Sequence, residues 1–193
     1  MSHSAVFLDR DGVLVEDRDL LVHAEDLRVL AGVAEALGRL KAAGFRLIVI
    51  TNQAVVARGM ITEAAVVEIH RQMSRLLELA GAPPLDAFYF CPHHPQATLP
   101  EYRVECDCRK PRHGSLLRAA REQDLDLAAS FMVGDRITDV ICGQGAGCQT
   151  VLLQSPASAA LPIVTLEPID ASVRPDYICP DLRTAADWIL TPR

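Results

Sequence analysis

The sequence predicts an α/β protein in which a Rossmann-like parallel sheet is covered by helices on both faces. Two observations predict this fold class. Short apolar runs alternate with longer amphipathic segments along the chain, which is typical of successive β-α units. Polar groups also follow directly after several of the apolar runs, as expected where a parallel sheet holds a ligand at the carboxyl ends of its strands.

The strands are the short apolar runs. The second run, Arg46–Ile50, is rich in β-branched residues, which favour strands. Each run is long enough for one buried strand and too short for a helix. In chain order the expected strands are Ala5–Leu8, Arg46–Ile50, Ala87–Phe90, Ser130–Val133 and Gln149–Leu153.

The helices are the segments between these runs. Gly44 is a stop signal for the first helix, and Thr62 and Gly81 are the expected N-cap and terminator of the second. We expect residues 91–113 and Gln154–Pro175 to be mostly loop. The expected helices are Ala31–Ala43, Thr62–Ala80, Gly114–Gln123, Ile137–Gly143 and Ala185–Leu190.

Length and composition narrow the class of protein. A chain of 193 residues fits a single domain, residues 1–193, and its net charge of −6 argues against a nucleic-acid binder. The N-terminus has no basic region followed by an apolar run, and no long uncharged apolar segment follows. We therefore expect a cytoplasmic protein without a membrane partner, and, because no coiled coil is evident, a monomer.

The polar groups after the strands form one chemical set. Asp9 and Asp11 follow the first strand, Thr51 and Asn52 the second, Lys110 the Cys/His loop, and Asp135 the fourth strand. Each pattern alone is common in turns and loops. Their order after successive strands indicates that they meet at one edge of the sheet.

These residue types suit phosphoryl transfer. A carboxylate such as Asp9 can attack phosphorus, and a second carboxyl such as Asp11 can protonate the leaving oxygen and then activate water. Mg²⁺ relieves the repulsion between close carboxylates, and Asp135 is a natural further ligand. Lys110 and the Thr51 hydroxyl can bind the phosphoryl oxygens, and Gly12 permits close backbone approach.

The motifs resemble those of the haloacid dehalogenase-like (HAD-like) phosphatases. "DRDGV", Thr51, Lys110 and "GDRITD" match the four motifs of that superfamily in order, from Asp9 to Asp139. The resemblance implies a HAD-like fold, Asp9 as nucleophile and Asp11 as general acid/base. It implies Mg²⁺ bound by Asp9, the backbone carbonyl of Asp11 and Asp135, phosphate bound by Thr51 and Lys110, and Asp139 supporting the metal site or orienting Lys110.

Further motifs resemble a narrower group, the heptose 1,7-bisphosphate 7-phosphatases and the related histidinol-phosphate phosphatases. They are "CPHHPQ…CDCRKP", "TNQ…ARG", "MVGD" and "AADWIL". Twelve residues separate His93 from Cys106, a loop length that favours the heptose enzymes. Within this resemblance the substrate is a small phosphorylated sugar, Asn52 is a candidate phosphate-binding residue, and Arg58 and Arg109 are candidates for a second phosphate or sugar hydroxyls.

The sequence departs from the heptose pattern where a sugar would bind. The departures leave the phosphatase motifs intact and concern the substrate; they lie at Val15, Asp19, Leu20, Ala54 and Val55. Alternatives are therefore a histidinol-phosphate or other phosphomonoester phosphatase, and a zinc-stabilised binding module without catalysis. A mutase is disfavoured because no large cap domain is inserted after Asp11 or Thr51.

The segment at about 91–110 is a candidate zinc loop. Its C-x-H and C-x-C pairs could supply four ligands to tetrahedral zinc. From spacing alone, His93 could instead cap a turn, and a disulfide is the rival interpretation, disfavoured in a reducing compartment and strained between Cys106 and Cys108. The resemblance nominates Cys91, His93, Cys106 and Cys108. Four protein ligands leave no open position, so this zinc is expected to be structural.

The remaining cysteines and histidines have simpler interpretations. We expect Cys142, Cys148 and Cys179 to fill the core. His94 is expected at the surface or in a loop, and His23 and His70, away from every motif, are expected to be structural or solvated.

Overall fold

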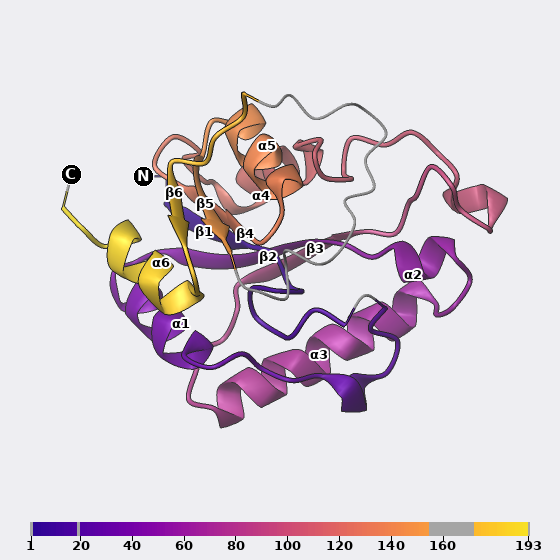
Figure 1. The fold of residues 1–193 in the computed structure, drawn as a ribbon, viewed down its shortest axis with the longest axis horizontal. Helices are drawn as coiled ribbons and strands as arrows, with labels where there is room; N and C mark the ends of the chain where they lie inside the picture. Colours follow the sequence, from indigo (N-terminus) through magenta and orange to yellow (C-terminus); the bar gives the residue numbers. More distant parts are fainter. Residues whose placement is uncertain (1, 19, 155–171, 193) are drawn as a thin grey trace.

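The computed structural model describes residues 2–18, 20–154 and 172–192. These residues contain a six-stranded sheet with the order β3-β2-β1-β4-β5-β6, and all neighbouring strands are parallel (Figure 1). The predicted fold class is confirmed. The strands are β1 (Ala5–Leu8), β2 (Arg46–Asn52), β3 (Ala87–Cys91), β4 (Phe131–Gly134), β5 (Gln149–Leu153) and β6 (Tyr177–Cys179).

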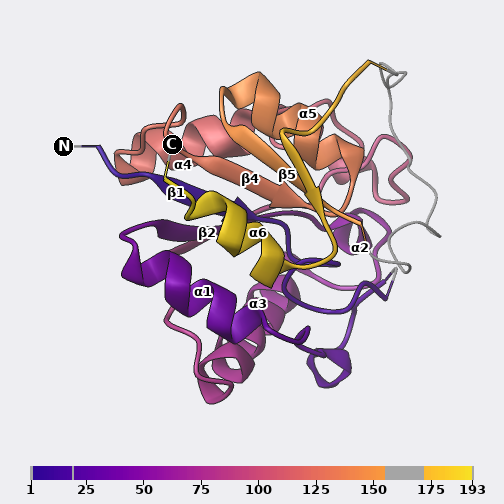
Figure 2. The same cartoon turned by 60° about the vertical axis from the view of Figure 1, so that its left-hand side comes forward.

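Helices cover both faces of the sheet, as Figures 1 and 2 show from two directions. Three helices lie on one face: α1 (Val33–Ala42), α3 (Glu63–Leu79) and α6 (Leu182–Ile189). Two lie on the other: α4 (Gly114–Gln123) and α5 (Ile137–Ala146). The short helix α2 (Ala54–Ala57) and the 3₁₀ turns η1 (Ala24–Asp26) and η2 (Pro100–Tyr102) lie in the connections.

Alternation along β1 divides the core into two layers. Val6 and Leu8 pack into the cluster under α1, α3 and α6, whereas Ala5 and Phe7 pack into the cluster under α4. All four side chains are fully buried. A strand covered on both faces has this continuous apolar pattern, and its period of two places the next residues, Asp9 and Arg10, on opposite sides.

The residues expected to begin and end the second long helix, α3, do so in the structure. The Thr62 hydroxyl accepts a hydrogen bond from the Ala65 N–H, which caps the start of α3. Gly81 follows the end of α3 with φ of 89°, a conformation that favours glycine. Strand β2 extends beyond the expected Ile50 to Asn52, so two candidate site residues lie in the sheet itself.

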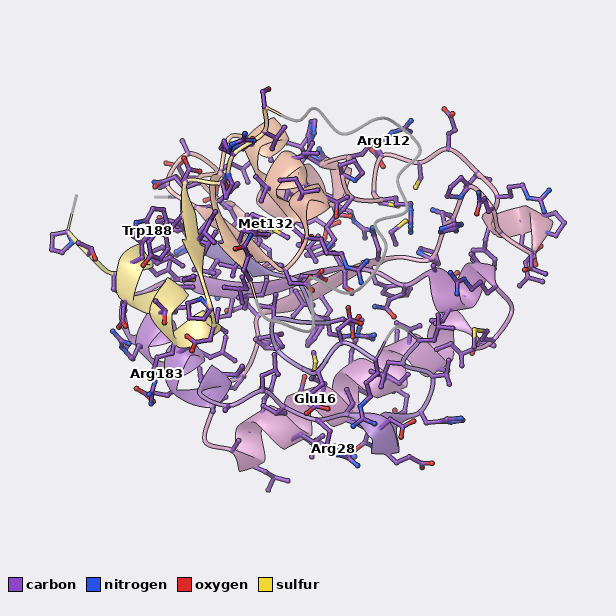
Figure 3. The ribbon with its side chains drawn as sticks, in the orientation of Figure 1. Glu16, Arg28, Arg112, Met132, Arg183 and Trp188 are labelled. Atoms are coloured by element: carbon purple, nitrogen blue, oxygen red, sulfur yellow. The ribbon has the colours of Figure 1, made fainter. Side chains whose placement is uncertain are left out.

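The C-terminal part contains an element that the pattern did not predict. Strand β6 has only three residues, too few for alternation to be recognised. The last helix, expected to include Ala185–Leu190, is α6, which begins at Leu182 because Asp181 caps it and ends at Ile189. Trp188 of α6 stacks on Tyr177 of β6 at 5.0 Å between ring centroids; Figure 3 labels Trp188 on α6, beside β6. This stack fixes the last helix against the edge strand.

Two of the sequence expectations fall on residues that the structure does not describe. They are the departure at Asp19 and, in the segment Gln154–Pro175, residues 155–171. Within the described part of the chain, no helix is long and apolar enough to cross a membrane.

Candidate active site

The carboxyl ends of the central strands surround one cavity of about 300 Å³. The residues after β1, at the end of β2 and after β3 gather at this edge of the sheet (Figure 1). The site lies at the end of β1, whose neighbours in the sheet are β2 and β4. The helices that follow β1 and β2 lie on one face of the sheet, and those that follow β3 and β4 lie on the other. The cavity is lined by Asp9, Arg10, Asp11, Asp17, Arg18, Leu20, Leu21, Thr51, Asn52, Gln53, Ala54, Val55, Arg58, His94, Arg109, Lys110, Arg136 and Thr138.

Lys110 joins two carboxylates at the base of this cavity. Its Nζ lies 2.8 Å from Asp9 Oδ2 and 2.6 Å from Asp139 Oδ1, and it donates a hydrogen bond to the Ile50 carbonyl. Burial alone would lower the pKa of Lys110, but the charges of Asp139 and Asp9 raise it above its ordinary value. The ammonium group is therefore charged and held beside Asp9.

Asp135 lies beside Asp9, and its carboxylate accepts no hydrogen bond from the described residues. Oxygen atoms of Asp9, Asp135 and Asp139 lie within 4.8 Å of one another, and all three residues are buried. Both carboxylate oxygens of Asp135 are buried without a hydrogen-bond partner in the described residues. Burial, followed by the charge of Asp9, raises the pKa of Asp135 to about 8, and burial raises that of Asp9 to about 6.

This donor set fits a hard divalent cation. Lys110 forms ion pairs with two of the three clustered carboxylates, and both oxygen atoms of the third, Asp135, have no donor in the described residues. Mg²⁺ binds oxygen ligands, and a cation here would offset the repulsion that raises the carboxylate pKa values.

Gly12 gives the backbone room at this point. Its φ is 76°, and a Cβ atom added there would lie 2.3 Å from Asp135 Oδ2. A side chain would both strain the backbone and displace the Asp135 carboxylate. The glycine therefore permits the turn after Asp11 to pass directly over Asp135.

The Asp11 carboxylate is held by two neighbours. Arg10 donates from Nε and Nη2 at 2.9 to 3.2 Å, and Gln53 Nε2 donates to Oδ2 at 3.2 Å. Gln53 also donates to the Thr51 hydroxyl at 2.8 Å. The side chain of Asp11 is partly exposed, and it lines the cavity beside Asp9. Arg10 and Gln53 were not predicted, because their roles depend on contacts made in the folded chain.

Asn52 bonds to the backbone of Lys110. Its Oδ1 accepts from the Lys110 N–H and its Nδ2 donates to the Lys110 carbonyl, both at 3.1 Å. Asn52 also lines the cavity. The end of β2 thus holds the lysine that enters from a distant loop.

Two arginines, Arg58 and Arg109, and one histidine, His94, also line the cavity. Burial, then the charges of Arg109 and Arg58, lower the pKa of His94, and all three residues line the cavity. His94 is 5% exposed, and its Nδ1 accepts from the Gln96 N–H. His94 lies in a loop, as one of the two expected alternatives has it, but it is not at the surface, since the loop folds inward and encloses the ring.

Three of the five departures from the heptose pattern border the cavity. Leu20, Ala54 and Val55 are among the lining residues. Val15 is buried instead in the core, where it bridges to Asp11 and Val29. The apolar replacements therefore lie in the cavity wall and outside the carboxylate cluster.

The Cys/His loop forms a second candidate metal centre. The Cys91 Sγ lies 3.6 Å from Cys106 Sγ and 3.7 Å from His93 Nδ1, and Cys108 Sγ lies 3.6 Å from His93 Nδ1. Tetrahedral zinc with sulfur and nitrogen ligands requires neighbouring ligand atoms about 3.5–3.8 Å apart. All four ligand atoms lie within 4.8 Å of one another, so the residues fit zinc.

The rival disulfide interpretation does not describe the structure. All six cysteines are free, and the Cys91–Cys106 sulfur separation far exceeds the roughly 2.05 Å of a disulfide bond. Cys142, Cys148 and Cys179 are buried in the two core clusters, as predicted. His70 is also buried, at 4% exposure, whereas His23 is exposed.

The zinc loop is continuous with the cavity wall. Arg109 and Lys110 directly follow Cys108, and Arg109 Nη1 donates to the His93 carbonyl at 3.1 Å. The Ser115 hydroxyl, at the start of α4, donates to the Cys108 carbonyl at 3.0 Å. A metal ion bound by the four side chains would therefore brace the segment that carries Lys110.

Known proteins share this sequence and fold. The D-glycero-β-D-manno-heptose-1,7-bisphosphate 7-phosphatase of Escherichia coli strain K12 is 38% identical over 96% of this chain and 87% of its own length. The enzyme of the same name from Photorhabdus laumondii is 43% identical over 70% of this chain and 72% of its own. The chain belongs to the heptose-bisphosphate phosphatase family of HAD-like hydrolases. It is thus a phosphoric monoester hydrolase.

Two further comparisons agree with this family. Residues 107–185 match the HAD-hydrolase-like family model. The D,D-heptose 1,7-bisphosphate phosphatase of B. bronchiseptica, solved with magnesium and phosphate, superposes with a TM-score of 0.78 and 31% identity over 97% of this chain and 98% of that one. The two chains therefore share one fold over almost their whole lengths.

Proposed function

We propose that this protein is a Mg²⁺-dependent phosphatase that removes the 7-phosphate of D-glycero-β-D-manno-heptose 1,7-bisphosphate. The observation that carries this proposal is the position of Asp9 beside both Lys110 and the Asp135 carboxylate, which accepts no hydrogen bond from the described residues. The names of the E. coli and Photorhabdus relatives support the substrate and its anomer. The whole chain is taken as one phosphatase domain.

The first step forms an aspartyl-phosphate. A carboxylate oxygen of Asp9 attacks phosphorus, and the bond between phosphorus and the C7 oxygen breaks. Asp11 gives its proton to that oxygen, so the sugar leaves as an alcohol. Lys110 and the Thr51 hydroxyl stabilise the charge on the phosphoryl oxygens.

The second step releases phosphate. Asp11, now a carboxylate, accepts a proton from water as the water oxygen attacks phosphorus. The bond between phosphorus and Asp9 breaks, which regenerates the Asp9 carboxylate and yields inorganic phosphate. Arg10 and Gln53 keep Asp11 within reach of both oxygens through their hydrogen bonds.

Two metals are part of the proposal. Asp9, the Asp11 backbone carbonyl and Asp135 would hold Mg²⁺, which neutralises charge as the phosphoryl group is transferred. Asp139 would orient Lys110, to which it is ion-paired. Cys91, His93, Cys106 and Cys108 would hold a structural zinc ion that has no open ligand position.

Two basic residues of the cavity wall could bind the second phosphate of the substrate. Arg58 and Arg109 line the cavity near His94, and Arg109 is fixed by its bond to the His93 carbonyl. We assign these arginines to the 1-phosphate or to sugar hydroxyls. Leu20, Ala54 and Val55 would contact the sugar carbons.

The test is phosphate release with Mg²⁺ from a substrate panel. The panel contains both anomers of the heptose bisphosphate, histidinol phosphate and simple phosphomonoesters. We expect preference for the β-anomer, and loss of turnover in Asp9→Asn but not in Asp26→Asn, which changes the same side-chain type outside the cavity. Equal activity of Asp9→Asn would refute the mechanism, and preference for histidinol phosphate would refute the substrate.

A further inference from the structure

His94 is a buried residue of the cavity wall that the proposed reaction does not use. It lines the cavity, and only 5% of its surface is exposed. Both of its backbone groups are bonded within the Cys/His loop: the N–H donates to the Tyr102 carbonyl and the carbonyl accepts from the Ala97 N–H, at 3.1 and 3.0 Å. The loop therefore holds this histidine in one position at the cavity.

One hydrogen bond decides which ring nitrogen of His94 carries the proton. Nδ1 accepts from the Gln96 N–H at 3.1 Å, so the proton of a neutral ring resides on Nε2. Burial, and next the positive charges of Arg109 and Arg58, lower the pKa of His94 below its ordinary value, so the ring is neutral at pH 7. The Nε2–H group is then the single polar donor of the ring, and it makes no hydrogen bond to the residues that the structure describes.

A hydrogen bond connects Arg109 to the backbone at His94. Arg109 Nη1 donates at 3.1 Å to the carbonyl of His93, which belongs to the peptide bond that joins His93 to His94. Arg109 itself directly follows Cys108, at the other end of the loop. The guanidinium group is therefore fixed to the backbone that carries the imidazole ring, and both residues line the cavity.

Arg58 is connected to the same loop through helix α2. The carbonyl of Ala57, the last residue of α2, accepts from the N–H groups of Thr98 and Leu99 at 2.9 and 3.1 Å. These two residues directly follow the turn that begins at His94. Arg58 is the next residue after Ala57 and lines the cavity as well. Hydrogen bonds to the backbone of one loop thus position all three cavity-lining residues.

The three side chains offer only donors to a ligand. A guanidinium group has no acceptor, and the single ring acceptor of His94 is already used by the Gln96 N–H. Arginine binds phosphate oxygens through paired N–H donors. A neutral N–H group can bind a further oxygen without adding a third positive charge to the two arginines. This donor set therefore fits a phosphate group.

We propose that His94 is a specificity-determining residue whose Nε2–H donates a hydrogen bond to the second phosphate of the bisphosphate substrate, together with Arg58 and Arg109. This inference rests on the proposed function, because it deepens the role given there to the two arginines. It selects the 1-phosphate, rather than the sugar hydroxyls, as the group that they bind.

The arrangement distinguishes bisphosphates from monophosphates. The heptose 7-phosphate presents the same reacting group to Asp9 but has no 1-phosphate to accept a bond from His94. A contact to a remote phosphate that is equally strong in the ground state and the transition state changes KM and leaves kcat unchanged. Loss of the His94 donor should therefore raise KM for the bisphosphate much more than KM for the monophosphate.

The kinetic experiment compares His94→Asn with His94→Gln in the full-length protein. Asparagine keeps an acceptor for the N–H group two residues on, as in an Asx turn, but places no donor at the position of Nε2. Glutamine can extend its amide N–H to that position. We expect His94→Asn to raise KM for the bisphosphate about 10- to 100-fold, the effect of one hydrogen bond to a charged group, with kcat little changed. KM for the 7-phosphate should change less than about 3-fold, and His94→Gln should recover most of the lost binding.

His23→Asn is the matched control, because it makes the same change at an exposed histidine that does not line the cavity. It should leave both KM values unchanged. Equal rises in KM for the two substrates in His94→Asn would indicate a role in the loop structure alone and would overturn the proposal. An unchanged KM for the bisphosphate in His94→Asn would overturn it as well.

Two further measurements do not depend on turnover. The ¹⁵N NMR shifts of His94 in the wild-type protein should show the ring proton on Nε2, and a proton on Nδ1 would overturn the proposal. Calorimetric titration of Asp9→Asn with the heptose bisphosphate gives Kd without hydrolysis, and adding His94→Asn should raise this Kd about 10- to 100-fold. Equal Kd values, or no binding to Asp9→Asn, would overturn the proposal. A wild-type protein without phosphatase activity would refute the proposed function, while the titration would still decide the role of His94.

Discussion

The side-chain amide of Asn52 makes two hydrogen bonds to the backbone of Lys110, one as donor and one as acceptor. The two residues are 58 positions apart in sequence. Asn52 ends β2, whereas Lys110 follows the Cys/His loop. The pair therefore connects the rigid sheet to the loop that supplies the positive charge beside Asp9.

Replacing Asn52 with alanine should loosen this connection. Two hydrogen bonds worth about 1 kcal/mol each are lost, and we expect Tm to fall by about 4–8 °C for a protein of this size. Turnover should fall about 10-fold as Lys110 loses its position. Thermal unfolding and steady-state kinetics measure both effects. Gln72→Ala, which removes an exposed amide bonded to Glu68, should change neither; unchanged kcat in Asn52→Ala would contradict the role.

Replacing Gly12 with alanine should damage the metal site. The new Cβ would meet Asp135 Oδ2 at 2.3 Å, and φ at position 12 is positive. We expect Mg²⁺ affinity and turnover each to fall about 10-fold or more, as expected when a ligand carboxylate is displaced. Gly147→Ala is a matched control, since it has a similar φ of 85° but no atom within 4 Å. Magnesium titration of both variants decides the matter: equal affinities would contradict the steric argument.

Stabilisation by Mg²⁺ should increase with pH. The pKa of Asp135 is about 8 in the folded protein and 3.8 in the unfolded chain. Between pH 3.8 and pH 8, the metal-free folded protein therefore binds a proton at Asp135 that the unfolded chain does not. Stability of the metal-free protein is therefore lost as pH rises through this window. A cation competes with the protons, so the Mg²⁺-induced rise in Tm should be larger at pH 8 than at pH 6. In Asp135→Asn this pH dependence should largely disappear; its persistence would point to another group.

Loss of zinc should lower activity without removing any proposed catalytic residue. Cys106→Ser takes one sulfur from the four-ligand cluster, and we expect the purified protein to contain little zinc. Turnover should fall about 10-fold or more because the segment carrying Lys110 is no longer braced. Metal analysis and kinetics should be compared with Cys148→Ala, a core cysteine outside the loop. Full activity in a zinc-free Cys106→Ser protein would show that the brace is unnecessary.

The strand-end rule predicted most of the carboxylate cluster. Asp9, Thr51 and Asp135 come at or just after the ends of strands, and the fold brings such positions together at one edge whatever the intervening sequence. Lys110 was placed in the same set because it ends the Cys/His loop that follows the third strand. The physical basis is the parallel sheet, whose register is fixed by buried apolar runs such as Val6–Leu8.

Other parts of the site depend on contacts that the sequence does not encode locally. His94 adjoins a metal-ligand candidate, so the pattern gave no reason to place its ring in the cavity. Arg10 stands between two motif residues, and its almost complete burial arises only in the folded chain. Strand β6 was missed because a three-residue strand at a sheet edge has no measurable period; the neighbouring strand β5 supplies its pairing.

The residues that line the cavity come from two kinds of backbone segment. Asp9 and Thr51 are attached to the ends of buried strands, whereas Leu20, Ala54, Val55 and His94 come from connections and a four-residue helix. Mutations in the second group disturb little of the core. In a directed-evolution experiment, mutations in the connecting segments should therefore change substrate preference. The rate of phosphoryl transfer should be retained, because the residues at the strand ends stay in place.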